Sequence, residues 1–258
     1  MRVQSLYIYP IKSGPAVGLE QVNVVERGLA HDRRFMVVDA HGTFRSQRTH
    51  PALGRYTVRA DDEALRLEAD GIGSCEVALE PAGGEPQQVR VWGDSVHATS
   101  VSAEADAFFS ALLEAPSRLV YMPPTSRRPV SGYDAMAVSF ADGYPVLLAN
   151  TASLSDLNAR IDGEDLPMLA FRPNVVLDTD EAWAEDGWGT LALGEAVLEC
   201  ATGCERCSMT TLDPAWPRRP RGDGEPLRTL AKFRRDASGK VIFGRNAVVK
   251  TPGVIRCG

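Results

Sequence analysis

Short segments in which hydrophobic and polar residues alternate dominate the first hundred positions of the chain. They are rich in valine, leucine and aromatic residues and are separated by glycine, proline or aspartate, which is typical of β-strands joined by tight turns. The expected strands cover residues 3–9, 22–25, 35–38, 43–48, 65–68, 75–79 and 88–92. Glycine at the turns predicts two hairpins, one joining 35–38 to 43–48 and one joining 75–79 to 88–92. Strands at this spacing indicate a barrel or a sandwich.

Helical periodicity is limited to a few places. Apolar residues recur at helical spacing over residues 105–113, and Ser102 is placed to cap that helix. A second helix is expected from Ser153, which lies three residues before Asp156 in a capping-box arrangement, and a third covers residues 226–233. The remaining strands are expected at residues 120–122, 146–148, 175–177, 191–193, 196–200, 241–243 and 247–249. The chain is therefore predicted to be mainly β with a few helices, an α+β fold.

Composition narrows the choice of partner and compartment. A net charge of −6 argues against broad binding to nucleic acid or to membrane surfaces. No apolar run is long enough to span a membrane, and the first residues do not form a signal peptide. The five cysteines are an odd number, so thiols or metal ligands are expected rather than disulfides, in a reducing cytoplasmic setting. The segment 214–226 is rich in proline, arginine and glycine and is expected to be a surface loop.

The segment 203–211 concentrates the chemistry, because it holds two thiols, an arginine and three hydroxyls in nine residues. A thiolate is a soft metal ligand, and a guanidinium binds carboxylate or phosphate. Three interpretations follow from these residues: a structural zinc site, an iron–sulfur cluster that also uses Cys200, or one thiolate on a metal that carries an anionic cofactor. Zinc requires paired ligand sets, whereas a single C-x-x-C motif stands alone here.

Several polar residues recur where predicted strands end, and such loops are where barrels place their ligand sites. Lysine and arginine in these loops would bind a phosphate through charge-assisted hydrogen bonds. The candidates are Lys12, Ser13, Arg33, Arg48, Asp142, Tyr144, Arg172, Asn174, Arg206 and Cys207.

Eight motifs, in the same order along nearly the whole chain, resemble the MOSC family, named for the C-terminal domain of molybdenum-cofactor sulfurase. The resemblance is greatest to the stand-alone type that includes YcbX-like proteins and the mitochondrial amidoxime-reducing component. The motifs lie at residues 6–13, 32–39, 140–145, 171–176, 184–188, 204–214, 225–230 and 243–246.

This resemblance implies an N-terminal β-barrel region at residues 1–95 packed with a MOSC β-barrel domain at residues 96–258. It also implies a molybdenum–pyranopterin cofactor whose metal is bound by Cys207, the expected catalytic residue. The residues implied to hold the pterin and its phosphate are Lys12, Ser13, Arg33, Asp142, Tyr144, Arg172, Asn174 and Arg206. Tyr144 departs from the small hydroxyl residue that is frequent in relatives at this position.

The resemblance further implies an oxidoreductase that reduces small N-hydroxylated compounds. The chain shows no cluster domain after Gly258, so the electrons are expected from a separate donor protein carrying flavin, haem or an iron–sulfur centre. The alternative is a carrier that binds molybdenum cofactor or sulfur and transfers it without turnover. Full sulfurases add a pyridoxal-phosphate domain, and no candidate for its Schiff-base lysine is found here.

Overall fold

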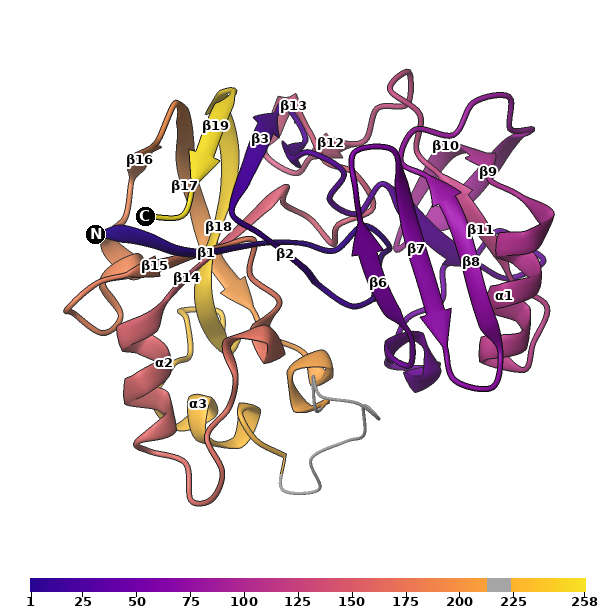
Figure 1. Ribbon diagram of the computed structural model, residues 1–258. Coiled ribbons are helices and arrows are strands. Elements are labelled where there is room, and N and C mark those ends of the chain that lie inside the picture. The colour runs from indigo at the N-terminus through magenta and orange to yellow at the C-terminus, as the bar shows by residue number, and fades with distance from the viewer. Residues whose placement is uncertain (213–223) are drawn as a thin grey trace. The chain divides into compact units, whose positions relative to one another are not determined.

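The computed structural model describes residues 1–212 and 224–258 (Figure 1). The chain forms two compact units, and neither is continuous in sequence. The first unit contains Met1–Tyr7, Gly18–Ala30 and Tyr144–Gly258, and the second contains Ile8–Val17 and His31–Gly143. Strands dominate both units, so the predicted mainly β fold with a few helices is confirmed.

A 7-stranded sheet forms the centre of the first unit, in the order β16-β17-β18-β14-β15-β1-β2. Its central strands β14 and β15 are parallel, because the helix α2 connects them. A 3-stranded sheet, β19-β3-β4, completes this unit. The bounds are β1 (Arg2–Ile8), β2 (Val17–Leu19), β3 (Gln21–Val25), β4 (Gly28–Leu29), β14 (Val146–Asn150), α2 (Thr151–Asn158), β15 (Val175–Asp178), β16 (Thr190–Leu193), β17 (Ala196–Glu205), α3 (Leu227–Phe233), β18 (Ile242–Thr251) and β19 (Gly253–Arg256).

An aromatic pair organises the core on the helix-covered side of this sheet. The rings of Phe171 and Phe243 stack with their centroids 3.8 Å apart, and Leu157 of α2 and Leu230 of α3 belong to the same buried cluster. Gly244 follows Phe243 with a left-handed φ of +76°, and a Cβ there would lie 2.7 Å from the carbonyl oxygen of Leu148. Only glycine fits this close approach of β18 to β14.

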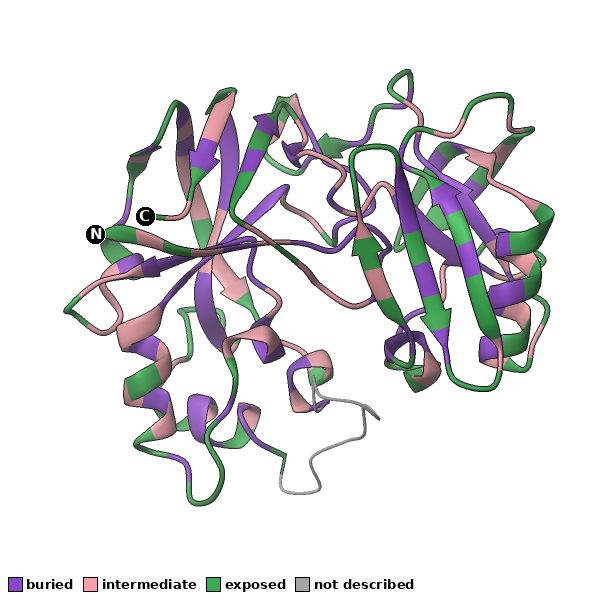
Figure 2. Ribbon diagram, viewed as in Figure 1, coloured by how far each residue is buried: buried purple, intermediate pink, exposed green. Residues whose placement is uncertain are grey.

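The second unit contains a 4-stranded sheet, β5-β11-β10-β9, a 3-stranded sheet, β6-β7-β8, and the pair β12-β13. The strand pairs within these sheets are antiparallel. Along β7, buried and exposed residues alternate, as Figure 2 shows for a sheet with one solvated face. The bounds are β5 (Phe35–Val38), β6 (Thr57–Ala60), β7 (Ala64–Ala69), β8 (Gly73–Ala78), β9 (Pro86–Val91), β10 (Asp94–Ser100), α1 (Ala103–Leu113), β11 (Arg118–Tyr121), β12 (Pro129–Val130) and β13 (Tyr133–Ala137).

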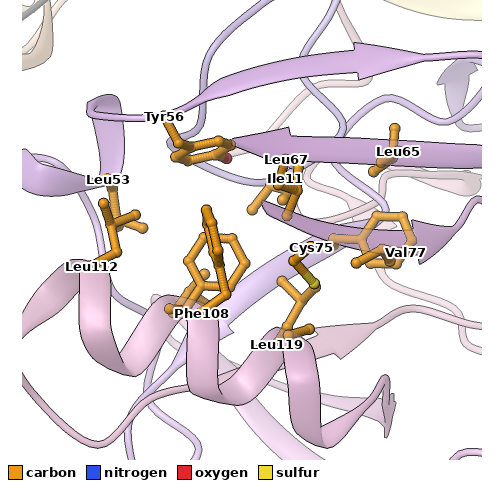
Figure 3. Close-up of a cluster of buried hydrophobic side chains, with 14 of the residues drawn as sticks. Ile11, Leu53, Tyr56, Leu65, Leu67, Cys75, Val77, Phe108, Leu112 and Leu119 are labelled. Carbon is orange, nitrogen blue, oxygen red and sulfur yellow. The ribbon is translucent and has the colours of Figure 1, made fainter. Parts of the chain in front are cut away.

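Helix α1 closes one core of the second unit, shown in Figure 3. Its Phe108 and Phe109 meet the ring of Tyr56 edge-on, with centroids 6.2 and 5.7 Å away. Ser102 caps this helix as predicted, since its hydroxyl accepts a hydrogen bond from the amide of Ala105. The third predicted helix is also confirmed, as α3.

The predicted turn after residues 35–38 is confirmed, but the strand expected at 43–48, the second hairpin and one helix start are wrong. The chain turns after β5 and returns beside it, but residues 43–48 make only isolated bridges and no strand. β8 pairs with β7 and β9 pairs with β10, so the expected hairpin between 75–79 and 88–92 does not form. Helix α2 is capped by Asn150, whereas Ser153 is buried inside its first turn. The predicted loop covers residues 214–226, and its residues 214–223 lie outside the described part of the chain.

Candidate functional site

The turn after β1 places Lys12 inside the second unit. Ser13 has a left-handed φ of 63°, and the amide of Gly14 donates to the carbonyl of Ile11 at 2.9 Å. The amide of Lys12 donates to the carbonyl of Phe35 at 2.8 Å, and the side-chain amide of Gln47 donates to the Ser13 carbonyl. The backbone is therefore fixed on both sides of the Lys12 side chain.

The Lys12 ammonium is buried, with 4% of the residue exposed, and it has two acceptors. Its Nζ lies 2.8 Å from the carbonyl oxygen of Phe140 and 2.5 Å from Oδ1 of Asp142. Burial lowers the pKa of Lys12, and the carboxylate of Asp142 opposes that shift. The structure thus brings together two of the predicted site residues, Lys12 and Asp142.

Asp142 also accepts a hydrogen bond from the indole Nε1 of Trp92, at 3.1 Å from its Oδ1. The surrounding chain disfavours a charge at this carboxyl, but the Lys12 ammonium, the Trp92 hydrogen bond and the Arg48 charge hold the pKa of Asp142 below its ordinary range. The carboxylate is ionised at neutral pH and therefore acts there as a hydrogen-bond acceptor.

Arg33 lies in a second polar group of the same unit. It has a left-handed φ of 48°, its Nη1 is 2.5 Å from Oδ2 of Asp32, and its guanidinium lies 4.3 Å from the centroid of the Tyr9 ring. Asp32 is buried and its Oδ1 accepts from the amide of Tyr9 at 2.8 Å. The amide of Phe140 donates to the Arg33 carbonyl, which links this group to the segment that carries Asp142.

In the first unit, Arg206 and Cys207 follow β17. Nη2 of Arg206 donates to the Phe171 carbonyl at 2.7 Å, and Nη1 contacts Sγ of Cys204 at 2.9 Å. The Nε atom of Arg206 is buried and has no hydrogen-bond partner among the described residues. Cys207 is half-buried, and its carbonyl accepts from the amide and the hydroxyl of Thr210, so the thiol begins a short 3₁₀ turn of defined geometry.

Arg172 and Asn174 precede β15 in the same unit. Arg172 has a left-handed φ of 56° directly after Phe171, whose carbonyl binds Arg206. The Asn174 side chain is buried between two strands: its Oδ1 accepts from the amide of Leu147 and its Nδ2 donates to the carbonyl of Tyr7. Asn174 therefore ties β1 to β14, which fixes the backbone beside Arg172.

Tyr144 is half-buried, and within the described part of the chain its hydroxyl has no hydrogen-bond partner. Residues 1–212 and 224–258 contain no group of three or more His, Cys, Asp or Glu side chains arranged to hold a metal. All five cysteines are free. Among these residues, Cys207 is therefore one free thiol with Arg206 beside it in the chain.

The sequence did not single out Trp92 or Arg128, which support this site. Arg128 is 5% exposed and donates to the carbonyls of Ser139, Ala141 and Asp142. Trp92 has a left-handed φ of 54° in the hairpin turn between β9 and β10. The dipeptide Trp92-Gly93, a bulky residue beside glycine at a turn, is the sequence feature that could have pointed to Trp92.

Comparison with known proteins gives matches along most of the chain. Models of the MOSC N-terminal beta barrel domain and the MOSC domain match residues 1–116 and 135–258. The chain is 32% identical to mitochondrial amidoxime-reducing component 1 of Mus musculus, over 99% of this chain and 80% of that protein. The Homo sapiens protein of the same name is 30% identical, over 99% and 81%. The molybdenum cofactor sulfurase of Oryza sativa subsp. japonica is 27% identical over 95% of this chain, which spans 32% of that protein.

No helix among the described residues is both long and apolar enough to cross a membrane.

Proposed function

Because the chain belongs to the MOSC family, we propose that it is a molybdenum-cofactor-dependent reductase of small N-hydroxylated compounds, with electrons from a separate donor protein. The observation that carries this proposal is the extent of similarity to the amidoxime-reducing components, which covers 99% of this chain and 80% of the mouse protein. Similarity to the rice sulfurase covers only 32% of that larger protein, so the cofactor-sulfurating activity in its name is less well supported here.

The described residues fit such a cofactor on two counts. Cys207 offers one partly accessible thiol, and the described residues supply no further protein ligands beside it, as expected when a dithiolene supplies the other sulfur atoms. Beside it, the buried Nε–H of Arg206 lacks an acceptor among the described residues, and an anionic group would provide one. In this proposal Cys207 binds the metal, and the pterin and its phosphate are held by Lys12, Ser13, Arg33, Asp142, Tyr144, Arg172, Asn174 and Arg206.

When bound, the cofactor supplies two-electron oxygen-atom transfer, and the protein residues bind, orient and hold charge. The net reaction converts an N–OH group to N–H and releases water, which consumes two electrons and two protons. Asp142 is an acceptor at neutral pH because its pKa is lowered, so it would orient a donor group rather than supply a proton. Arg206 is fixed by Phe171 and Cys204 and keeps its positive charge for an anion. We propose that water delivers the protons. We also propose that the protein is located in the cytoplasm.

The second candidate is a carrier that binds the cofactor and transfers it without turnover. The similarity to the rice sulfurase over 95% of this chain favours this alternative, since that relative is named for acting on the cofactor. The two functions share one binding site and differ in turnover.

The test uses protein made in a host that synthesises the cofactor, with Cys207→Ser beside Cys257→Ser. Cys257 is a matched control, a partly buried thiol whose Sγ contacts the Leu19 carbonyl. Metal per chain is measured by mass spectrometry, and turnover of benzamidoxime to benzamidine by chromatography with a reduced viologen dye. The parent and the control should hold near-stoichiometric molybdenum and turn over, whereas Cys207→Ser should lose both.

Molybdenum without turnover in the parent, together with transfer of the cofactor to an acceptor apo-enzyme, would favour the carrier. A parent without molybdenum, or a Cys207→Ser variant as active as the control, would refute the reductase.

A further inference from the structure

An arginine stacked on a tryptophan lies beside the Lys12–Asp142 pair in the second unit. The Arg48 guanidinium lies 4.4 Å from the centroid of the Trp92 ring. Trp92 is 43% exposed, although it is anchored through its indole N–H to Asp142 and packs against Phe44 at 4.9 Å between ring centroids. Asp142 and Phe44 therefore hold the Trp92 ring in place, and the Arg48 guanidinium above the ring is open to solvent.

The backbone conformation of Trp92 is a second observation that points to a ligand site. Trp92 and Gly93 form a two-residue turn between the paired residues Val91 and Asp94, and Trp92 has φ +54°. A left-handed first turn residue is normally glycine, because a side chain there is strained. Strain of this kind persists where the surroundings enforce it, often at ligand sites.

The cations of this region differ in how much of their hydrogen-bonding capacity is already used. Lys12 directs two of its three N–H donors to Phe140 and Asp142 and is 4% exposed, so its charge is neutralised inside the protein. Arg48 is exposed, and within residues 1–212 and 224–258 its guanidinium donates to no protein acceptor. All five of its N–H donors are available to a ligand, and they lie in the plane of the guanidinium itself.

We infer that Arg48, oriented by Trp92, is an oxyanion-binding group of the second unit, and that the ligand carries a phosphate or a carboxylate. A planar guanidinium binds either group through two parallel hydrogen bonds. Stacking on Trp92 reduces the side-chain entropy lost on binding, because the guanidinium is already oriented. This inference deepens the proposed function, under which the oxyanion is the phosphate of the cofactor or an acidic group of the substrate.

The inference is tested on protein made without cofactor, so that its outcome is separate from molybdenum content and turnover. Inorganic phosphate and benzoate are titrated separately at low ionic strength, and the indole N–H signals are followed by NMR. Trp92→Phe identifies the Trp92 signal. Arg48→Gln is compared with Arg90→Gln, a control that removes an equal, exposed charge from β9.

Phosphate should shift the Trp92 signal, and Arg48→Gln should weaken phosphate binding about fivefold to tenfold, as expected for a partly exposed charge-assisted contact. Arg90→Gln should bind within about twofold of the parent, because its loss affects only the screened long-range field. If benzoate binds more tightly than phosphate, and Arg48→Gln weakens that binding, the ligand group is a carboxylate. Equal weakening by both variants, or no shift of Trp92 with either anion, overturns the inference.

The outcome is distinguishable from that of the reductase proposal. Normal molybdenum and turnover with anion binding that does not depend on Arg48 would remove this inference alone. Anion binding that depends on Arg48 in a chain that never takes up molybdenum would remove the reductase alone. Thermal unfolding of Arg48→Gln at the parent temperature shows that the variant is folded.

Discussion

Arg128 of the second unit and Arg206 of the first are both held by backbone carbonyls, yet they differ in what they leave unpaired. In Arg128, Nε donates to Asp94 at 2.6 Å, and the two Nη atoms donate to three carbonyls of residues 139–142. In Arg206, one Nη donates to a carbonyl and the other to a thiol, and the buried Nε has no partner among the described residues.

The comparison motivates the proposed role of Arg206 as an anion-binding residue, although the Nε atoms of Arg45, Arg118, Arg234 and Arg245 are also buried without a partner among the described residues. A buried guanidinium with every nitrogen paired holds a segment in place and has little left to offer. A guanidinium with a buried unpaired donor costs free energy until an acceptor arrives, so binding an anion there recovers that cost. In the second unit, the buried Lys12 ammonium already has two acceptors, whereas the exposed Arg48 guanidinium has none among the described residues.

The largest expected effect is on the structural arginine. Arg128→Met should lower the free energy of unfolding by about 3 kcal/mol, because three carbonyls lose a charged donor; the ion pair to half-exposed Asp94 adds little. Urea denaturation measures this loss. Arg127→Met is the control, since Arg127 is exposed and its effect should stay below about 1 kcal/mol. Equal losses in the two variants would show that the pairing of Arg128 is not structural.

A smaller effect on stability and a larger one on binding are expected at Arg206. Arg206→Met should lower the free energy of unfolding by only about 1 kcal/mol, because it removes a half-buried side chain that already carries an unpaired donor. Under the proposed function, the affinity for the pterin should fall about tenfold. The pterin that stays bound through gel filtration is measured by the fluorescence of its oxidised form. Arg206→Lys keeps the charge and should retain more pterin than Arg206→Met. A stability loss as large as that of Arg128→Met, with pterin retained, would reverse the assignment.

Local patterns predicted elements well where one element decides its own structure. Ser102 and the apolar spacing after it specify α1, and the strand that ends before Pro10 presents Lys12 at its end. The pairing of β8 and β9 was wrong because both strands alternate in the same way while facing different cores. Cys75 and Val77 pack into one cluster and Val89 and Val91 into another, and periodicity does not report which core a face meets.

The helix start at Ser153 failed for a related reason. The Ser153 hydroxyl donates to the buried Glu185 at 2.7 Å, and Asn150 accepts from the amide of Ala152 and caps α2 instead. A capping motif shows only that the local sequence is compatible with a helix start. Here the Ser153 hydroxyl is bonded to a carboxylate that is distant in sequence, so it does not cap the helix. The contacts of Trp92 and Arg128 could not be predicted from local sequence either, because their partner Asp142 lies 50 and 14 positions away.

The smallest expected effect concerns Asp142, whose backbone carbonyl serves Arg128 while its carboxylate serves Lys12. The pKa of Asp142 is lower in the folded chain than the ordinary 3.8 of the unfolded chain, so the folded state binds fewer protons. Its stabilisation is therefore fully present above about pH 4 and is lost as the pH falls through the folded-state pKa. The side chain is 67% exposed, which limits the contribution through solvent screening to about 1 kcal/mol.

Asp142→Asn should accordingly lower the free energy of unfolding by up to about 1 kcal/mol at pH 7, and the difference from the parent should shrink steadily from pH 4 to pH 2. Urea denaturation across that range measures it. In a Lys12→Met background the same substitution should show a much weaker pH dependence, because the ammonium that lowers the Asp142 pKa is gone. An undiminished pH dependence there would mean that Trp92 and Arg48, rather than the buried lysine, keep this carboxylate charged.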